Sequence, residues 1–496
     1  MLLIVGAMTS PTVYTSAGTR PIESTLRRYC RIPWYILPEY SAGSSMASVW
    51  DVVIVGAGAA GLSCARRLLT ASKSLPSVLI LEGRSRTGGR CYTDAKFGDT
   101  GGAWLHGTRG SGSSRNCLFD EAGCGSSSEM DWDAAAVYDA TGERVGDDVL
   151  TQAEAEWELV TRRVEKLQDK GNADSPLSRG IERAVSELKA SGRLHALLDE
   201  RLLHLFKSET YDLDYAAFLP DTSLWYFDCD RISEGDHVPL GGLGNLVWSA
   251  VGFTPPLAAA ATSPTSELKL SHVVSRVSIV EPDSGLLQVE SSGGTFVCRH
   301  CVVTAPLGVL QSGRLSFEPQ LPPSFAQSLG ESGMGVLNKS ILLFDEVFWD
   351  ADASVLCCLG PPCRPLGWFF NDYKYSGRKA LVYLTGGDDG RRCEADTDEE
   401  RTQHVMRLLE AMYGERCKPP SDVHHTRWWA DPRSMGSYSY RRVGFNPAHG
   451  FKGFQTPYYN GRLFFAGEHT SKDYSSTVHG AIESGRRAAD QVLRAY

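Results

Sequence analysis

The stretch "DVVIVGAGAAGLSCARRLL", residues 51–69, places the strongest constraint on how this chain folds. It reads as a buried apolar strand, a glycine turn and a helix, and a second apolar run follows at 77–84. Continuous apolar strands of this kind belong to parallel sheets that are covered on both faces. The sequence therefore predicts an α/β fold that begins with a βαβ unit.

The glycines of this turn have the GxGxxG spacing of a dinucleotide-binding site. Gly56 permits the tight turn, Gly58 lets the backbone approach a pyrophosphate, and Gly61 lets the helix pack closely on the strand. The helix that begins at Ala59 presents free N–H groups to the phosphates. Glu82 ends the next apolar run, where a carboxylate accepts hydrogen bonds from an adenosine ribose. An acid there argues against NADP but does not separate NAD from FAD.

Three arginines follow this acid in "EGRSRTGGRCYT", namely Arg84, Arg86 and Arg90. A guanidinium can hold a diphosphate through two parallel hydrogen bonds, so these residues are candidates for the phosphate site. A solvated basic loop is the alternative interpretation.

The composition narrows the range of functions that the chain can have. The chain has 496 residues and a net charge of −9, which disfavours nucleic acid as the main partner and permits a cationic substrate. The 13 cysteines are odd in number and scattered, so a reducing compartment is favoured. Cys298 and Cys301 have CxxC spacing without a second pair, and we interpret them as structural, so no metal site is predicted. No apolar run is long enough to span a membrane.

The chain ends as it begins, with an apolar run at 463–466 and a helical pattern from Val478. We therefore expect a discontinuous Rossmann-like nucleotide domain with an inserted substrate-binding domain of mixed sheet and helices. The nucleotide domain is assigned to residues 50–115, 240–320 and 455–496. The substrate-binding domain is assigned to residues 116–239 and 321–454. Long helices are expected at 151–170, 181–206 and 399–414.

The first 49 residues have basic residues and few acids. Two interpretations stay open: an organellar transit segment, or a disordered stretch that precedes a true start at Met46. A cytoplasmic location is expected under the second interpretation, and an organellar one under the first.

Several motifs in order resemble the flavin-containing amine oxidases, from about residue 50 to the end of the chain. They are "VVIVGAGAAGL", "LILEGRSRTGGR", "GGAWLHG", "VVTAPLGVL", "GVLNKSILLFDEVFW" with "RWWADPRSMGSYSY", and "RLFFAGEHTSKDYSSTVHGAIESG". Within that family, the polyamine oxidases and the lysine-specific histone demethylases look nearest. The resemblance implies that the dinucleotide is FAD.

The resemblance also implies cofactor contacts. Glu82 and Arg90 would bind the adenosine ribose and the diphosphate, and Val274 would meet the adenine. The remaining contacts would come from Glu468 at the middle of the cofactor, and from Gly102, Ala103, Thr477 and Val478 at the flavin.

Three further residues are candidates for the chemistry. Lys339 would hold a water at flavin N5, Tyr438 would flank the substrate amine together with Thr477, and His106 in "AWLHG" could contact that amine. From the sequence pattern alone, Lys339 reads as an exposed strand end. For Tyr438 the alternative is a core aromatic. For His106 it is a satisfied structural residue. Thr477 stands where many relatives have a second aromatic.

The implied reaction is the FAD-dependent oxidation of spermine, spermidine or an N-acetylated form. Hydride would pass to the flavin, and the products would be an aldehyde, a shorter amine and, with oxygen, hydrogen peroxide. The alternatives are a histone-demethylase-like or other amine oxidase, and a flavin-binding protein without turnover. The acidic stretch 120–155 could steer a polycation, although a solvated face is favoured. His469, His479 and the oligomeric state are left unassigned.

Overall fold

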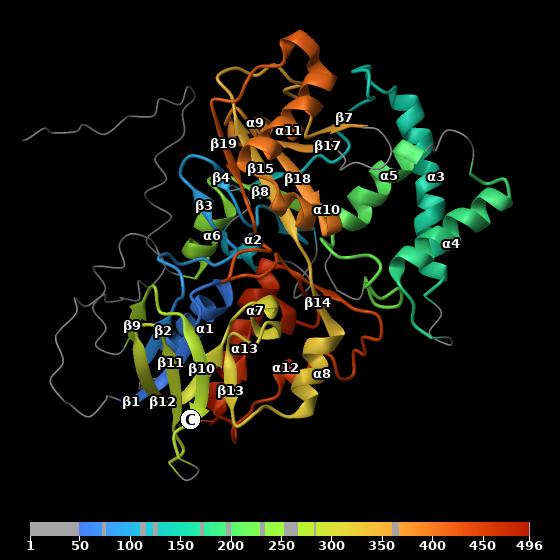
Figure 1. Cartoon of the computed structure of the whole chain (residues 1–496). Helices are drawn as coiled ribbons and strands as arrows, with labels where there is room; N and C mark the ends of the chain where they lie inside the picture. The colour runs from blue at the N-terminus through green and yellow to red at the C-terminus, as the bar shows by residue number, and fades with distance from the viewer. Residues whose placement is uncertain are drawn as a thin grey trace, which may run out of the picture.

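The computed structural model describes residues 49–71, 76–109, 116–122, 127–168, 173–194, 200–228, 234–251, 266–281, 284–359 and 367–495. Two β-sheets dominate this part of the chain, the larger one in the lower half of Figure 1 and the smaller one above it. Almost all of the predicted N-terminal extension, 1–49, lies outside the described residues. None of the described helices is long and apolar enough to cross a membrane.

The larger sheet has the strand order β13-β10-β11-β12-β1-β2-β9, with β21 beside β12. Its strands are β1 (Val49–Val55), β2 (Val78–Leu81), β9 (Ser266–Lys269), β10 (Val274–Ile279), β11 (Leu287–Ser291), β12 (Gly294–Val303), β13 (Ser316–Glu318) and β21 (Leu463–Phe465). β1 runs parallel to both β2 and β12, and β12 runs parallel to β21. The carboxyl ends of these strands therefore meet at one edge, where open α/β sheets bind their ligands.

Helices cover both faces of the larger sheet, as its continuous apolar strands require. α1 (Ala59–Ala71), α6 (Leu243–Ala250) and α13 (Val478–Ala495) pack on the face that carries Val52 and Ile54. α7 (Leu307–Gln311), α8 (Pro323–Glu331) and α12 (Lys452–Gln455) pack on the face that carries Val53 and Val55. The two ends of the chain thus meet, because α13 lies directly against α1 (Figure 1).

The smaller sheet has the strand order β19-β15-β18-β17-β16-β7. Its strands are β7 (Ala135–Tyr138), β15 (Leu337–Leu343), β16 (Val355–Cys358), β17 (Gly367–Asn371), β18 (Ala380–Gly386) and β19 (Asp422–His425). α11 (Asp398–Tyr413) covers one face and confirms the helix expected at 399–414. A capping box between Thr397 and Glu400 fixes where α11 begins.

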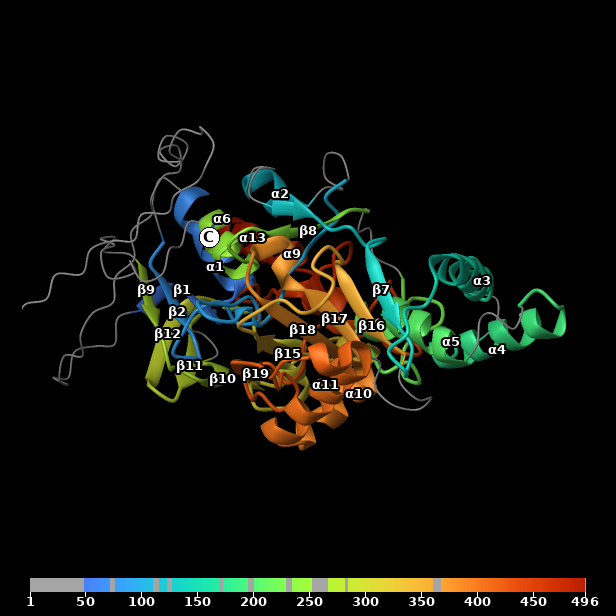
Figure 2. The same cartoon turned by 90° about the horizontal axis from the view of Figure 1, so that it is seen from above.

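Three helices form an arm that projects to the side of the molecule in Figure 2: α3 (Asp147–Lys166), α4 (Leu177–Ala190) and α5 (Glu200–Lys207). The expected single helix at 181–206 is wrong, because α4 ends before Gly192, whose φ of 69° is the left-handed conformation that terminates helices. α5 continues into η5 (Ser208–Leu213), one turn of π-helix. Such turns are rare and frequently mark functional sites.

Short elements join these layers. Small sheets are formed by β5 (Leu105–His106), β8 (Asp236–Pro239) and β6 (Ser127–Glu129), by β3 (Thr93–Asp94) and β4 (Gly98–Asp99), and by β14 (Ser332–Met334) and β20 (Ser439–Arg441). The remaining short helices include α2 (Cys117–Ala122), α9 (Asp372–Ser376) and α10 (Gly387–Arg392). The pairing of β5 with β8 and of β14 with β20 brings segments far apart in the sequence to the space between the two main sheets.

Candidate active site

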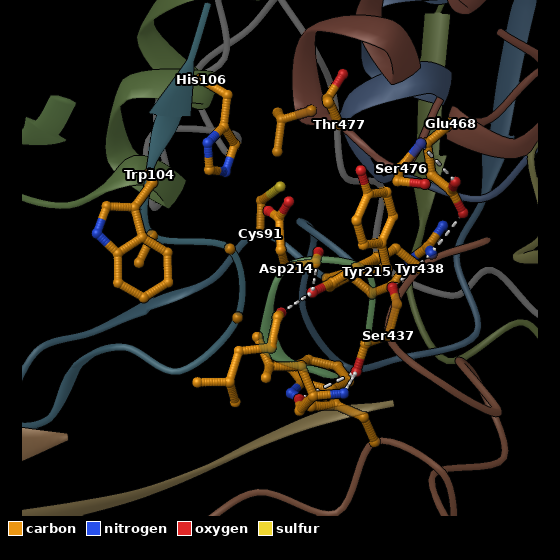
Figure 3. Close-up of a pocket in the computed structure, with 18 of the residues that line it drawn as sticks. Cys91, Trp104, His106, Asp214, Tyr215, Ser437, Tyr438, Glu468, Ser476 and Thr477 are labelled. Carbon is orange, nitrogen blue, oxygen red and sulfur yellow. Dashed lines mark hydrogen bonds and ion pairs between the residues drawn. The ribbon is translucent and has the colours of Figure 1, made fainter. Parts of the chain in front are cut away.

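A cavity of about 1240 Å³ lies between the two sheets. It begins at the carboxyl ends of β1 and β2 and runs to β15, β17, η5 and α3. Pockets for small ligands typically measure ~300–1,000 Å³, so this one has room for a dinucleotide and a substrate together. Figure 3 looks into its central part.

At the β1 end, the glycine turn has the shape that its spacing predicts. Gly56 has a φ of 105°, which favours glycine. A Cβ on Gly61 would lie 2.0 Å from the carbonyl oxygen of Gly56, so α1 packs against the turn at a distance that only glycine allows. A Cβ on Gly58 would meet nothing closer than 3.9 Å, and Gly58 and Ala59 line the cavity. The turn therefore forms an open cradle at the N-terminus of α1, which fits a diphosphate.

Glu82 lies at the end of β2, lines the cavity and is 6% exposed. One carboxylate oxygen accepts from the N–H of Ala57 at 2.7 Å, and the other accepts from the N–H of Arg84 at 2.8 Å. Burial raises the pKa of Glu82, and these two hydrogen bonds oppose the rise. The backbone thus fixes the carboxylate beside the glycine turn, where the ribose of a bound dinucleotide is expected.

The three candidate arginines occupy different positions. Arg84 donates to Asp431 and to Ser434, each at 2.8 Å, so it anchors the segment before β20. Arg86 lies over the ring of Tyr92 at 4.0 Å. Arg84 lines the cavity, and its predicted cofactor contact stays a prediction.

Arg90 lines the cavity and joins three segments of the chain. Its Nη1 donates to the carbonyl of Ser437 at 2.8 Å and to the Glu468 carboxylate at 2.9 Å. The other Glu468 oxygen accepts from the Ser439 hydroxyl at 2.7 Å and from the N–H of Ser476 at 3.1 Å. Burial would raise the pKa of Glu468, but the charge of Arg90 and the hydrogen bonds from Arg90 and Ser439 together hold the pKa below its ordinary value. Figure 3 shows Glu468 beside Ser476 at the edge of the cavity.

The N-terminus of α13 forms another wall of the cavity. The Thr477 hydroxyl caps it by accepting from the N–H of Gly480 at 3.0 Å. Thr477, Val478, Gly102 and Ala103 all line the cavity, and Val274 lines it near Glu82. A helix N-terminus attracts negative charge, so this wall suits the part of a flavin that gains electrons.

Lys339 in β15 is 4% exposed, although its sequence pattern reads as an exposed strand end. Its Nζ donates to the carbonyls of Asp99 and Gly101 at 2.8 and 2.7 Å and lies 5.3 Å from the ring centre of Trp104. Burial lowers the pKa of Lys339 to about 8, against the charges of Asp99 and Asp372. A lysine of this kind can hold or relay a proton near neutral pH.

Tyr438 lines the same cavity and is hydrogen-bonded to the backbone at the end of η5. Its hydroxyl donates to the carbonyl of Leu213 at 2.9 Å, and the carbonyl of Asp214 lies at 3.1 Å. Burial raises the pKa of Tyr438, so the hydroxyl stays protonated. Figure 3 shows Tyr438 and Tyr215 in the centre of the cavity, with His106 and Thr477 above them.

His106 belongs to a cluster that sequence reasoning missed. Its Nδ1 lies 2.8 Å from Asp236, and Asp236 also accepts from the indole of Trp132 at 3.0 Å. Burial alone would lower the pKa of His106, but Asp236 and the nearby Asp214 raise it above its ordinary value. Asp214 follows η5, and its exposed surface faces the cavity. Burial within the surrounding protein raises its pKa to about 6.

The unassigned histidines pack inside the fold. His469 is fully buried with its ring edge against Phe454, and His479 lies 4.9 Å from Tyr474 between ring centres. Burial lowers the pKa of His469 to about 4 and that of His479 to about 3, so both are neutral. Cys298 and Cys301 are free, fully buried core residues of β12.

Most of the described acids in the stretch 120–155 are exposed, as a solvated face requires. Asp133, Asp147 and Glu154 are among the exposed ones and also line the outer end of the cavity. Glu209 in η5 lines the same region. The sequence singles out the stretch 120–155 but not Glu209, because only the fold brings α3, η5 and the segment before β7 together.

The fold and the cavity define an oxidoreductase that holds a dinucleotide beside a substrate chamber. Residues 59–493 match the family model described as flavin containing amine oxidoreductase, and the chain belongs to that family. The protein is accordingly a flavin-dependent amine oxidase, and its cofactor is FAD.

Curated relatives include polyamine oxidases and histone demethylases. The chain is 32% identical over 461 residues to Polyamine oxidase 4 of Oryza sativa subsp. japonica, covering 90% of this chain and 89% of that one. It is 31% identical over 486 residues to Polyamine oxidase 2 of Arabidopsis thaliana, with 92% of each chain covered. It is 32% identical over 458 residues to Lysine-specific histone demethylase 1 homolog 2 of Oryza sativa subsp. japonica, covering 90% of this chain but 57% of that one.

Among solved structures, a wild-type putrescine oxidase bound to putrescine superimposes with a TM-score of 0.66 at 18% identity. The match covers 90% of this chain and 99% of that one. At this identity the likeness shows a shared fold.

Proposed function

We propose that this amine oxidase acts on linear polyamines such as spermine, spermidine or their N-acetylated forms. The observation that carries the proposal is the row of carboxylates along the cavity, where Asp236 and Asp214 lie near the flavin end and Glu209 lies farther out. A chamber with several acids at different depths suits a substrate with several ammonium groups better than a monoamine. The polyamine oxidases among the relatives support the same class of substrate.

Bound FAD would supply the two-electron acceptor for the hydride that leaves the carbon beside the reacting nitrogen. Loss of the hydride and of the nitrogen proton turns the C–N bond into an imine. Water then hydrolyses the imine to an aldehyde and a shorter amine. Oxygen would take the two electrons from the reduced cofactor and leave as hydrogen peroxide. The reacting nitrogen must be neutral, and its aromatic neighbours Tyr438 and Trp104 favour that form by excluding water. Lys339 is the group placed to hold or move a proton there. Asp214 and the His106–Asp236 pair hold a neighbouring ammonium.

The test is peroxide release with a panel of amines, followed by mass spectrometry of the products from spermine. We expect turnover of spermine or spermidine with an aldehyde and a shorter amine. If all polyamines are inert and a methyl-lysine peptide yields formaldehyde, the demethylase-like alternative replaces the proposal. If no amine reduces the bound flavin, the protein binds flavin without turnover.

The pKa of Asp214 predicts how polyamine binding depends on pH. As the pH falls through about 6, Asp214 takes up a proton and loses its attraction for an ammonium group. Substrate amines stay charged in this range, since alkylamines titrate near pH 10. The KM for spermine should therefore rise between pH 7 and pH 5. In Asp214→Asn the KM should be several-fold higher at pH 7 and nearly flat across this step; an unchanged step in the variant would assign it to another group.

A further inference from the structure

The outer end of the cavity carries four side chains to which neither the chemistry nor the cofactor assigns a role. Glu154 comes from α3, Glu209 from η5, Trp368 from β17, and Trp132 from the segment before β7. All four line the cavity. They come from three layers of the fold, so the sequence does not show them as one group.

The two carboxylates lack a basic partner. Within the described part of the chain, neither Glu154 nor Glu209 forms an ion pair or a hydrogen bond with a lysine or arginine. Acids elsewhere on the arm do: Glu158, one turn from Glu154, is 2.7 Å from Arg162, and Glu187 lies 2.5 Å from Arg163 and 2.8 Å from Arg183. Basic residues thus compensate Glu158 and Glu187 but not the two acids that line the cavity.

Trp368 places a polar group beside these acids that the described part of the protein leaves without a hydrogen bond of ordinary geometry, although Glu209 lies near it. The residue is 3% exposed, lines the cavity, and its Nε1 has no hydrogen-bond partner of ordinary geometry among the described residues. A buried polar group without a partner is rare in folded proteins and calls for an explanation. An approaching ligand that draws Glu209 towards the indole would supply one.

The electrostatics of Glu209 also favour a cation at the outer end of the cavity. Burial raises its pKa, the Trp368 indole lies near enough to offset part of the rise, and the charge of Glu154 raises it further. A carboxylate whose charge is disfavoured by burial and by a neighbouring acid is stabilised by a cation that binds beside it.

The tryptophans connect this region to the flavin end. The ring centres of Trp132 and Trp368 lie 6.4 Å apart, and Trp132 also donates to Asp236, the partner of His106. Aromatic surface therefore extends from the inner pair His106–Asp236 to the outer pair of glutamates. Such a surface suits the methylene chain of a polyamine, and its ring faces attract cations.

We propose that Glu209 and Glu154, together with Trp132 and Trp368, form an outer subsite for the distal ammonium group of a linear polyamine whose reacting carbon lies at the flavin end. The inference rests on the proposed function and adds to it a way in which the enzyme selects substrates by length. A long polyamine reaches the subsite while its inner nitrogen reacts. A short diamine that reacts at the same place does not reach it.

The test compares spermine with the short diamine putrescine in FAD-loaded enzyme. Glu209→Gln and Glu154→Gln are the test variants, and Glu158→Gln is the matched control because Glu158 does not line the cavity. A hydrogen bond to a charged group is typically worth enough to change affinity by roughly tenfold or more. We expect the KM for spermine to rise roughly tenfold in each test variant, at least five times more than the KM for putrescine. The control should match wild type on both amines.

Equal effects on the two amines, or no effect on spermine, would overturn the subsite. Calorimetric titration of spermine into oxidised enzyme keeps this test separate from the reaction itself. If no amine is oxidised, the proposed function fails, while a tenfold weaker spermine affinity in Glu209→Gln than in Glu158→Gln still supports the subsite. Wild-type enzyme that does not bind spermine contradicts both.

Discussion

Replacing Lys339 with methionine should slow the reduction of the bound flavin by amine by roughly 10²–10³-fold, the size of effect expected for a group that transfers a proton. The side chain is buried, lines the cavity and has a pKa lowered to about 8, so both of its protonation states are accessible near neutral pH. Methionine fills a similar volume and removes the amine. The flavin should stay bound, because the two hydrogen bonds of the Lys339 amine go to the backbone carbonyls of Asp99 and Gly101, and the residues expected to hold the diphosphate and ribose are unchanged.

Anaerobic stopped-flow absorbance measures this rate directly, and the ratio of flavin to protein checks retention of the cofactor. Lys379→Met is the matched control, since Lys379 is exposed and donates to the carbonyl of Asp345. In wild type the reduction rate should rise with pH through about 8, as Lys339 loses its proton, and this step should vanish in Lys339→Met. A variant that reduces its flavin at the wild-type rate removes Lys339 from the mechanism.

The parts of the fold that could be predicted from the sequence are those that depend on local patterns. The apolar runs of β1 and β2, the glycine turn and the amphipathic face of α13 each follow from neighbouring residues. Glu82 could be placed for the same reason, since it ends a strand beside that turn. The capped helix α11 needs only Thr397 and Glu400 to define its start.

The polar lining of the substrate chamber could not be predicted, because it is built from distant contacts. His106 and Asp236 are 130 residues apart and meet through the pairing of β5 with β8. Asp214 and Glu209 owe their positions to a π-helical turn that has no sequence signature, held at its end by the Tyr438 hydroxyl. The burial of Lys339 likewise follows from the packing of β15 against the 99–103 segment rather than from its own strand.

Family resemblance supplies a different kind of information from these patterns. It fixes FAD and the reaction type, because the glycine turn and the C-terminal segment are preserved as motifs. It does not fix substrate length, because the outer acids Glu154 and Glu209 lie outside every motif by which the family is recognised.

Gly61→Ala should destabilise the cofactor domain, whereas Gly58→Ala should leave the fold intact and weaken FAD binding. The added Cβ at Gly61 would lie 2.0 Å from a backbone oxygen of Gly56, and relieving that contact requires α1 to move away from β1. The Cβ at Gly58 meets no protein atom closer than 3.9 Å but occupies the cradle where a diphosphate binds. Each substitution adds one methyl group to the same turn, so each serves as the control for the other.

Thermal unfolding of the cofactor-free proteins and titration with FAD separate the two effects. Overpacking that moves backbone typically costs about 1–3 kcal/mol or more, so Gly61→Ala should lower the Tm or abolish soluble expression. Gly58→Ala should unfold close to wild type without FAD and bind FAD at least tenfold more weakly. Normal FAD affinity in Gly58→Ala would mean that the diphosphate does not lie against this turn, and the cofactor position inferred from the cradle would be wrong.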